Sequence, residues 1–231
     1  DNQHDRLESL LERRRRGEPI AYLSGKKEFW SMEFRVTPAT LIPRPETELL
    51  VERALQLIPH NQAYTIADLG TGSGAIAIAL AHEMPEIYVT AIDCSEAALE
   101  VARGNARRNR VEDRVACLAG DLKSLPAGPF DVIVSNPPYI PSRDWEQLMP
   151  EVRDHEPRLA LDGGDDGLEA YRRIAVQAVQ VLSPDGWLLV EVGIGQASVV
   201  SALFRAAGLT DVTQRDDYAG IPRVVTGRKQ L

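Results

Sequence analysis

The sequence has few cysteines, few histidines and no long apolar run. Cys94 and Cys117 are its only cysteines, and we expect both to be buried, which argues against a disulfide framework and fits a reducing compartment. The four histidines are scattered, and none is paired with cysteines at the spacing of a metal site. No stretch approaches the roughly 18 to 20 apolar residues that span a bilayer, and no signal peptide is recognised. These absences predict a cytoplasmic protein with no metal and no membrane partner.

An excess of basic charge is also missing. The chain has 26 Lys and Arg against 34 Asp and Glu, which gives a net charge of -8. Binding to the phosphate backbone of nucleic acids depends on clustered positive charge, so the balance argues against direct nucleic-acid binding. With 231 residues, 44% of them hydrophobic, the chain can form one large domain, or a domain with a smaller appendage.

The N-terminal part differs in pattern from the rest. The chain starts without Met and places Leu7, Leu10 and Leu11 on one helix face, so we interpret it as a helix cut from something longer. The four arginines of residues 13–16 are typical of a solvated helix end that the helix dipole favours. Partial alternation in KKEFWSMEFRV (residues 26–36) predicts a short hairpin, and an amphipathic helix is expected to begin near Glu46.

From Tyr64 onward, strands and helices alternate. Strands are predicted at residues 64–69, 87–93, 114–118, 130–135 and 186–192, with helices at 73–84, 95–109 and 167–182. This order predicts an α/β fold with a doubly wound, mostly parallel sheet. After a last helix at 196–208, two strand candidates at 211–216 and 223–229 follow without a helix between them. We expect these to pair antiparallel at the sheet edge, which completes a seven-stranded sheet.

The turn ADLGTGSGA (residues 67–75) joins the first of these strands to its helix. Gly70, Gly72 and Gly74 let the backbone approach a ligand and open the helix N-terminus toward it. The next strand ends in Asp93, nineteen residues after Gly74, at the spacing of an acid that binds ribose hydroxyls. Together these features predict a nucleoside cofactor. The turn alone also satisfies the loose dinucleotide fingerprint, so a nicotinamide cofactor stays open at this point.

Further motifs favour another cofactor. The turn, AIDCSEAA (91–98), GDL (120–122) and SNPPY (135–139) together resemble the class I S-adenosylmethionine-dependent methyltransferases that modify planar amide or amino nitrogens. IPRPETELL (42–50) and EVGIGQ (191–196) resemble more closely the HemK/PrmC family, which methylates the glutamine of the Gly-Gly-Gln motif in peptide-chain release factors. The resemblance implies a Rossmann-like fold, S-adenosylmethionine as the cofactor and release factors as the protein substrate.

The resemblance also implies a domain organisation and a set of site residues. That family has an N-terminal helical bundle, so residues 1–24 are expected to be its remnant, 25–45 a hairpin linker and 46–231 the methyltransferase domain. The adenine is expected to contact the carboxylate of Asp121 and the backbone N–H of Leu122. The expected cofactor-binding residues are Asp68, Gly70, Thr71, Gly72, Ser73, Gly74, Asp93, Cys94, Asp121, Leu122 and Asn136.

The SNPPY corner has a chemical rationale. A glutamine amide nitrogen is a poor nucleophile because its lone pair is delocalised into the carbonyl. The Asn136 side-chain oxygen and the Pro137 carbonyl can each accept one N–H and aim the nitrogen at the methyl group, while Tyr139 walls the planar amide. We therefore predict Asn136, Pro137 and Tyr139 as catalytic residues, and these three with Pro138 as the substrate-binding residues.

Several alternatives stay open at this stage. A glutamine methyltransferase acting on a ribosomal protein shares almost every site residue. A DNA adenine-N6 methyltransferase uses a similar corner and flips its base, but normally needs a recognition module and a basic face. A module that only senses S-adenosylmethionine is a third alternative. Roles for Arg44, Glu46 and Glu191 are undecided, and residues 142–166 could form a substrate lid or a solvated connection.

Overall fold

The computed structural model describes residues 2–59, 62–122 and 124–230. Within these residues one large sheet has the strand order β5-β4-β3-β6-β7-β9-β8. All pairs between β5 and β7 are parallel, whereas β9 pairs antiparallel with both β7 and β8. This confirms the doubly wound sheet and the antiparallel pair at its edge. The strands are β3 (Thr65–Leu69), β4 (Tyr88–Asp93), β5 (Val115–Ala119), β6 (Phe130–Ser135), β7 (Leu182–Glu191), β8 (Leu209–Asp216) and β9 (Pro222–Lys229).

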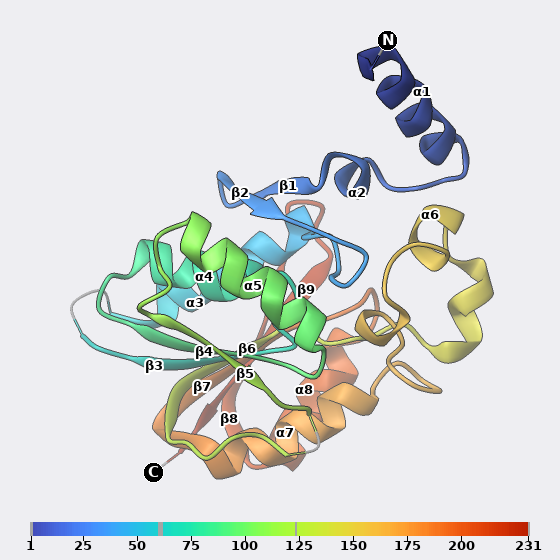
Figure 1. Ribbon diagram of the computed structural model, residues 1–231. Helices are drawn as coiled ribbons and strands as arrows, with labels where there is room; N and C mark the ends of the chain where they lie inside the picture. The colour runs from blue at the N-terminus through green and yellow to red at the C-terminus, as the bar shows by residue number, and fades with distance from the viewer. Residues whose placement is uncertain (1, 60–61, 123, 231) are drawn as a thin grey trace.

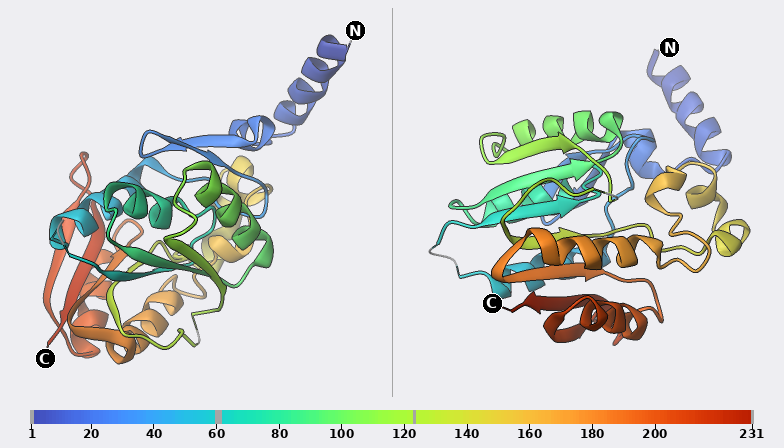
Figure 2. Two further views of the ribbon diagram at one scale, coloured as in Figure 1. Left: turned by 60° about the vertical axis from the view of Figure 1, so that its left-hand side comes forward. Right: turned by 90° about the horizontal axis from the view of Figure 1, so that it is seen from below.

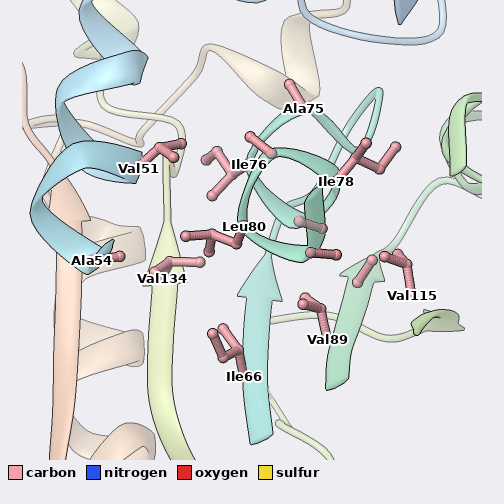
Figure 3. Close-up of a cluster of buried hydrophobic side chains, with 14 of the residues drawn as sticks. Val51, Ala54, Ile66, Ala75, Ile76, Ile78, Leu80, Val89, Val115 and Val134 are labelled. Carbon is pink, nitrogen blue, oxygen red and sulfur yellow. The ribbon is translucent and has the colours of Figure 1, made fainter. Parts of the chain in front are cut away.

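Helices cover both faces of this sheet (Figure 1). One face carries α3 (Glu48–Leu57), α4 (Ala75–Glu83) and α5 (Glu96–Arg108), and the other carries α7 (Glu169–Val181) and α8 (Ala197–Ala206). Residues 75–81 of α4 are all buried because the helix lies between α3, α5 and the sheet. Figure 3 shows this apolar layer, in which Leu80 of α4 lies between α3 and the sheet residue Val134.

The N-terminal segment forms the predicted hairpin. Strands β1 (Lys26–Phe29) and β2 (Met32–Arg35) pair antiparallel across a two-residue turn in which Trp30 and Ser31 both have positive φ. Phe29 and Phe34 from the hairpin belong to the same core cluster as α3 and α4. Before the hairpin lie α1 (Asn2–Arg15) and α2 (Ile20–Ser24), and α1 projects away from the body of the molecule (Figure 2).

Asn105 of α5 fastens the hairpin to the glycine-rich turn. This side chain is fully buried. Its Oδ1 accepts the Arg35 N–H at 2.8 Å, and its Nδ2 donates to the carbonyls of Arg35 and Ser73 at 2.9 and 2.8 Å. One amide therefore satisfies polar backbone groups of two segments far apart in sequence.

The segment from 142 to 166 is mostly a series of short turns. It contains η2 (Ser142–Gln147), α6 (Pro150–Arg153) and η3 (Arg158–Ala160). Its Glu156 is buried, pairs with the Arg44 guanidinium and accepts the Ile42 N–H at 3.1 Å. The segment is thereby tied to the chain just before η1 (Pro45–Thr47), a short helical turn that leads into α3. Among the described residues, no helix is long and apolar enough to cross a membrane.

Candidate active site

A cavity of about 590 Å³ lies at the carboxyl ends of β3, β4, β5 and β6. Doubly wound sheets bind ligands at this edge. The segment after η2 closes one side of the cavity through residues 157, 159, 160, 162 and 163, so it forms a wall of the site. The predicted site residues that line the cavity are Gly70, Gly72, Asp93, Cys94, Asp121, Leu122, Asn136 and Pro138.

The glycines of the first turn differ in what they face. Gly70 and Gly72 have φ of +71° and +55°, and a Cβ at either would meet nothing within 4 Å, so their backbone is open to the cavity. Gly74 has φ of +83°, and a Cβ there would lie 2.9 Å from Ile78 and 3.2 Å from Ala102. Its missing side chain allows α4 and α5 to pack closely. Thr71 and Ser73 are buried, and neither lines the cavity.

Asp93 ends β4 and holds the turn in place. Its Oδ2 accepts the Gly72 N–H at 2.8 Å and its Oδ1 accepts the Ser95 N–H at 2.9 Å. A carboxylate oxygen offers about two acceptor sites. Each oxygen of Asp93 therefore has capacity for a further hydroxyl, as a vicinal diol requires.

Asp68 lies beneath the turn and is fully buried. Its Oδ2 accepts the Thr71 hydroxyl at 2.6 Å and the Ala77 N–H at 3.2 Å. Its Oδ1 is the buried side-chain oxygen without a hydrogen-bond partner in the part of the chain that the structure describes. Burial raises the pKa of Asp68 to about 7 against the opposing effect of these hydrogen bonds. The carboxyl group supports the turn from below, away from the cavity lining.

The loop after β5 carries Asp121 and Leu122 and is fixed to α7. The Leu122 carbonyl accepts the Gln177 side-chain amide at 2.6 Å, and the Gln177 Oε1 accepts the Leu125 N–H at 2.7 Å. Asp121 Oδ1 accepts the Ser124 N–H at 3.2 Å. The Gln177 contacts fix this loop beside the cavity, which Asp121 and Leu122 line.

The expectation that both cysteines are buried is wrong. Cys94 is exposed and Cys117 is half-buried, and both are free thiols. Cys94 follows the last residue of β4, so it has left the covered part of the sheet and lies in the cavity wall. The free thiols agree with the prediction of no disulfide framework.

The NPPY corner follows β6 and is fixed from several sides. Ser135 donates to the Leu69 carbonyl at 2.7 Å, which joins the ends of β6 and β3. Asn136 Nδ2 donates to Thr47 Oγ1 at 3.2 Å. Pro137 is buried, and among the described residues no group donates a hydrogen bond to its carbonyl. Asn136 and Pro138 line the cavity, whereas Pro137 and Tyr139 lie in the same corner outside the lining set.

Tyr139 is positioned by Gln196, a residue whose role the sequence did not indicate. The Gln196 Nε2 donates to the Tyr139 carbonyl at 2.9 Å, and its Oε1 accepts the Gly193 N–H at 3.0 Å. Burial, together with the charge of Glu191, raises the pKa of Tyr139 to about 12, so its phenol stays protonated near neutral pH. Gln196 lies in the EVGIGQ motif noted in the sequence, but that motif did not show that Gln196 contacts Tyr139.

Thr47 and Glu156 were also missed as residues that organise the site. Thr47 lies in the PRPET motif and joins Asn136 to Glu191 through its hydroxyl. Glu156 occupies the undecided segment and pairs with Arg44. Both residues lie in segments that were noted in the sequence. Nothing in the sequence shows which distant side chains they contact.

Comparisons with known proteins identify the family of the chain. Residues 45–151 match the family model described as methyltransferase small domain. A release factor glutamine methyltransferase of Bradyrhizobium diazoefficiens is 50% identical over 228 residues, covering 97% of this chain and 77% of that protein. Another, from Geobacter sulfurreducens, is 48% identical over 220 residues, covering 95% of this chain and 76% of that protein. The chain belongs to the family of release factor glutamine methyltransferases.

A solved structure supports the fold of this methyltransferase. The methyltransferase from Pyrococcus furiosus superposes with a TM-score of 0.66 and 21% identity, covering 100% of this chain and 99% of that one. The class I methyltransferase fold predicted from the sequence is therefore confirmed.

Proposed function

We propose that this methyltransferase uses S-adenosylmethionine to methylate the side-chain nitrogen of the glutamine in the Gly-Gly-Gln motif of a peptide-chain release factor. One observation carries the proposal: Asn136 has its Nδ2 bound to Thr47, so its Oδ1 is the end left for a substrate N–H at the cavity. The names of the relatives at 43–50% identity support the choice of substrate. Of the residues predicted from the sequence, the proposal uses those that line the cavity, together with Pro137 and Tyr139 of the same corner.

The cavity residues fit S-adenosylmethionine. Asp93 can accept from the two ribose hydroxyls, Asp121 and the Leu122 N–H can meet the adenine edge, and Gly70 and Gly72 leave room along the turn. A volume of about 590 Å³ is within the usual range for small-molecule sites. When bound, the cofactor supplies an electrophilic methyl group on a sulfonium.

The residues of the corner act on the acceptor nitrogen. The Asn136 Oδ1 and the Pro137 carbonyl each accept one amide N–H, which draws charge onto the nitrogen and fixes the direction of its lone pair. After methyl transfer, the acceptor nitrogen held by these two oxygens would lose a proton to water. Tyr139 confines the amide plane and stays neutral. Positioning of the two reactants therefore accounts for the rate.

The methyl acceptor is identified by testing three candidate substrates separately. The purified protein is incubated with methyl-labelled S-adenosylmethionine and, separately, with an intact release factor, a ribosomal-protein preparation and duplex DNA. We expect label in the release factor, located by mass spectrometry of its digest at the glutamine of Gly-Gly-Gln. A short Gly-Gly-Gln peptide should be much poorer, because remote docking energy is lost. Label in DNA, or in a ribosomal-protein glutamine alone, would contradict the proposal.

A further inference from the structure

Two buried residues from other elements form a hydrogen-bond chain with the Asn136 amide. Thr47 at the end of η1 is 4% exposed, and Glu191 at the end of β7 is 3% exposed. Thr47 Oγ1 lies 2.6 Å from Glu191 Oε2 and 3.2 Å from Asn136 Nδ2. Because β6 and β7 pair with Ser135 opposite Val190, the residues that follow each, Asn136 and Glu191, come to the same edge of the sheet.

The direction of this hydrogen-bond chain is determined by proton count. A threonine hydroxyl has one proton to donate, and an ionised carboxylate can only accept. With Glu191 ionised, the Thr47 proton points to Glu191, so Thr47 can only accept from Asn136. An acceptor at that position selects the NH₂ end of the amide and turns Oδ1 toward the cavity.

We propose that Thr47 and Glu191 are positioning residues that fix the Asn136 amide with its carbonyl oxygen facing the acceptor nitrogen. Loss of the Thr47 hydroxyl removes one of the two acceptors, with Glu191, that favour the NH₂ end of the amide. A neutral Glu191 has a proton of its own and can donate it to Thr47, which frees the Thr47 proton to select the opposite, unproductive orientation of Asn136. The inference rests on the proposed function for its kinetic test, and not for its spectroscopic test.

The groups around Glu191 shift its pKa toward neutral pH. Burial raises the pKa of Glu191 to about 7, opposed by the Thr47 hydrogen bond and by the positive charge of Arg223 from β9. Glu46 from η1 raises the pKa further, and the Asn136 side chain lowers it. The tyrosines nearby, Tyr139 after β6 and Tyr171 on α7, have raised pKa values because they are buried, and stay neutral across this range.

The kinetic test uses single-turnover methyl transfer to an intact release factor, with cofactor affinity measured by calorimetry. We expect Thr47→Val to lower the transfer rate about tenfold or more, with cofactor affinity changed less than about twofold. Thr47→Ser keeps the hydroxyl and should recover most of the rate. Thr226→Val is the matched control, because Thr226 is 1% exposed and hydrogen-bonded to Thr213 on β8. Equal effects of Thr47→Val and Thr226→Val would overturn the inference.

The pH dependence gives a second kinetic readout. The wild-type rate should rise as Glu191 ionises between pH 6 and 8, and Glu191→Gln should remove that rise. An unchanged pH profile in Glu191→Gln would count against a role for Glu191. Transfer by the wild-type protein is recorded in the same assay, so failure of the proposed function is seen separately as no labelled release factor.

The spectroscopic test needs no substrate. The chain has five asparagines, so ¹⁵N-asparagine labelling gives few side-chain amide signals, and Asn136→Ser assigns that of Asn136. We expect the Asn136 NH₂ signals to shift with a midpoint near pH 7, to lose this titration in Glu191→Gln and to show a smaller shift in Thr47→Val. Signals that do not respond to pH in the wild-type protein would overturn the coupling between Glu191 and Asn136.

Discussion

At the scale of single residues, the proposed cofactor-binding and acceptor-binding residues form two separate groups. Asp93 and the glycine turn are at the ends of β3 and β4, whereas Asn136 follows β6 and is held by Thr47. The two groups are joined through the strand ends by Ser135, which donates to Leu69. Substitutions in one group should therefore affect mainly one measurable quantity.

Replacing Asp93 should weaken cofactor binding. Charge-assisted hydrogen bonds contribute roughly 1.5 to 3 kcal/mol, so we expect Asp93→Ala to reduce affinity for S-adenosylmethionine about tenfold or more while the protein stays folded. Titration calorimetry measures the affinity, and circular dichroism checks the fold. Asp113→Ala, an exposed acid before β5, is the control. Unchanged affinity in Asp93→Ala would exclude it from the cofactor site.

Replacing Asn136 should affect the chemical step. Because its Oδ1 is proposed to stabilise charge that develops on the acceptor nitrogen, Asn136→Ala is expected to lower kcat by about 100- to 1000-fold with a much smaller change in cofactor affinity. Tyr139→Phe should be mild and Tyr139→Ala severe, since the ring confines the amide. Single-turnover kinetics with cofactor titration decide this. A normal rate in Asn136→Ala would make the corner a structural turn only.

At the scale of elements, one glycine that precedes α4 and another inside α5 have opposite roles. Gly74 precedes α4 with positive φ and contacts Ala102 closely, whereas Gly104 lies inside α5 with open space around its Cα. The same substitution at each position therefore tests whether the crossing of α4 and α5 depends on the missing side chain.

We expect Gly74→Ala to destabilise the fold by about 1 to 3 kcal/mol, because the new methyl group meets Ile78 and Ala102 in a left-handed backbone conformation. Gly104→Ala should stabilise it by about 0.5 to 1 kcal/mol, since alanine is the better helix former. Urea unfolding followed by circular dichroism measures both. A neutral Gly74→Ala would show that α4 and α5 can separate without cost.

At the scale of the whole molecule, two buried carboxyl groups make stability depend on pH. Burial raises the pKa values of Asp68 and Glu191 to about 7, from ordinary values of 3.8 and 4.5. At pH values between the ordinary and the raised pKa values, the native state binds more protons than the unfolded chain. The free energy of unfolding therefore falls as pH rises from about 4 to 7, and stays lower above pH 7.

Glu191→Gln should reduce the loss of stability that accompanies rising pH. Measured as urea midpoints from pH 5.5 to 8, the wild-type protein should lose stability with rising pH, and Glu191→Gln should lose clearly less. Glu86→Gln, an exposed acid on the turn before β4, should follow the wild-type curve. Parallel curves for all three proteins would show that Glu191 does not titrate in this range.

The sequence by itself determined the alternation of strands and helices, the antiparallel end of the sheet and the two turns that carry Gly70 and Asn136. These are local properties, since periodicity, glycine and proline act through neighbours in the chain. The spacing of Asp93 after the glycine turn predicted that it ends the next strand, and β4 does end at Asp93.

Only the tertiary structure decided which side chains hold the site residues in place. Thr47, Glu191 and Asn136 are separated by many residues of sequence, and their meeting depends on how η1 packs against the ends of β6 and β7. The same holds for Asn105 under the glycine turn and for Glu156 beside Arg44. The apolar segment around Cys94 predicted that it is buried, whereas Cys94 follows the end of β4 and is exposed. The physical reason is that side-chain partners and exposure are set by packing between distant segments, which local patterns do not encode.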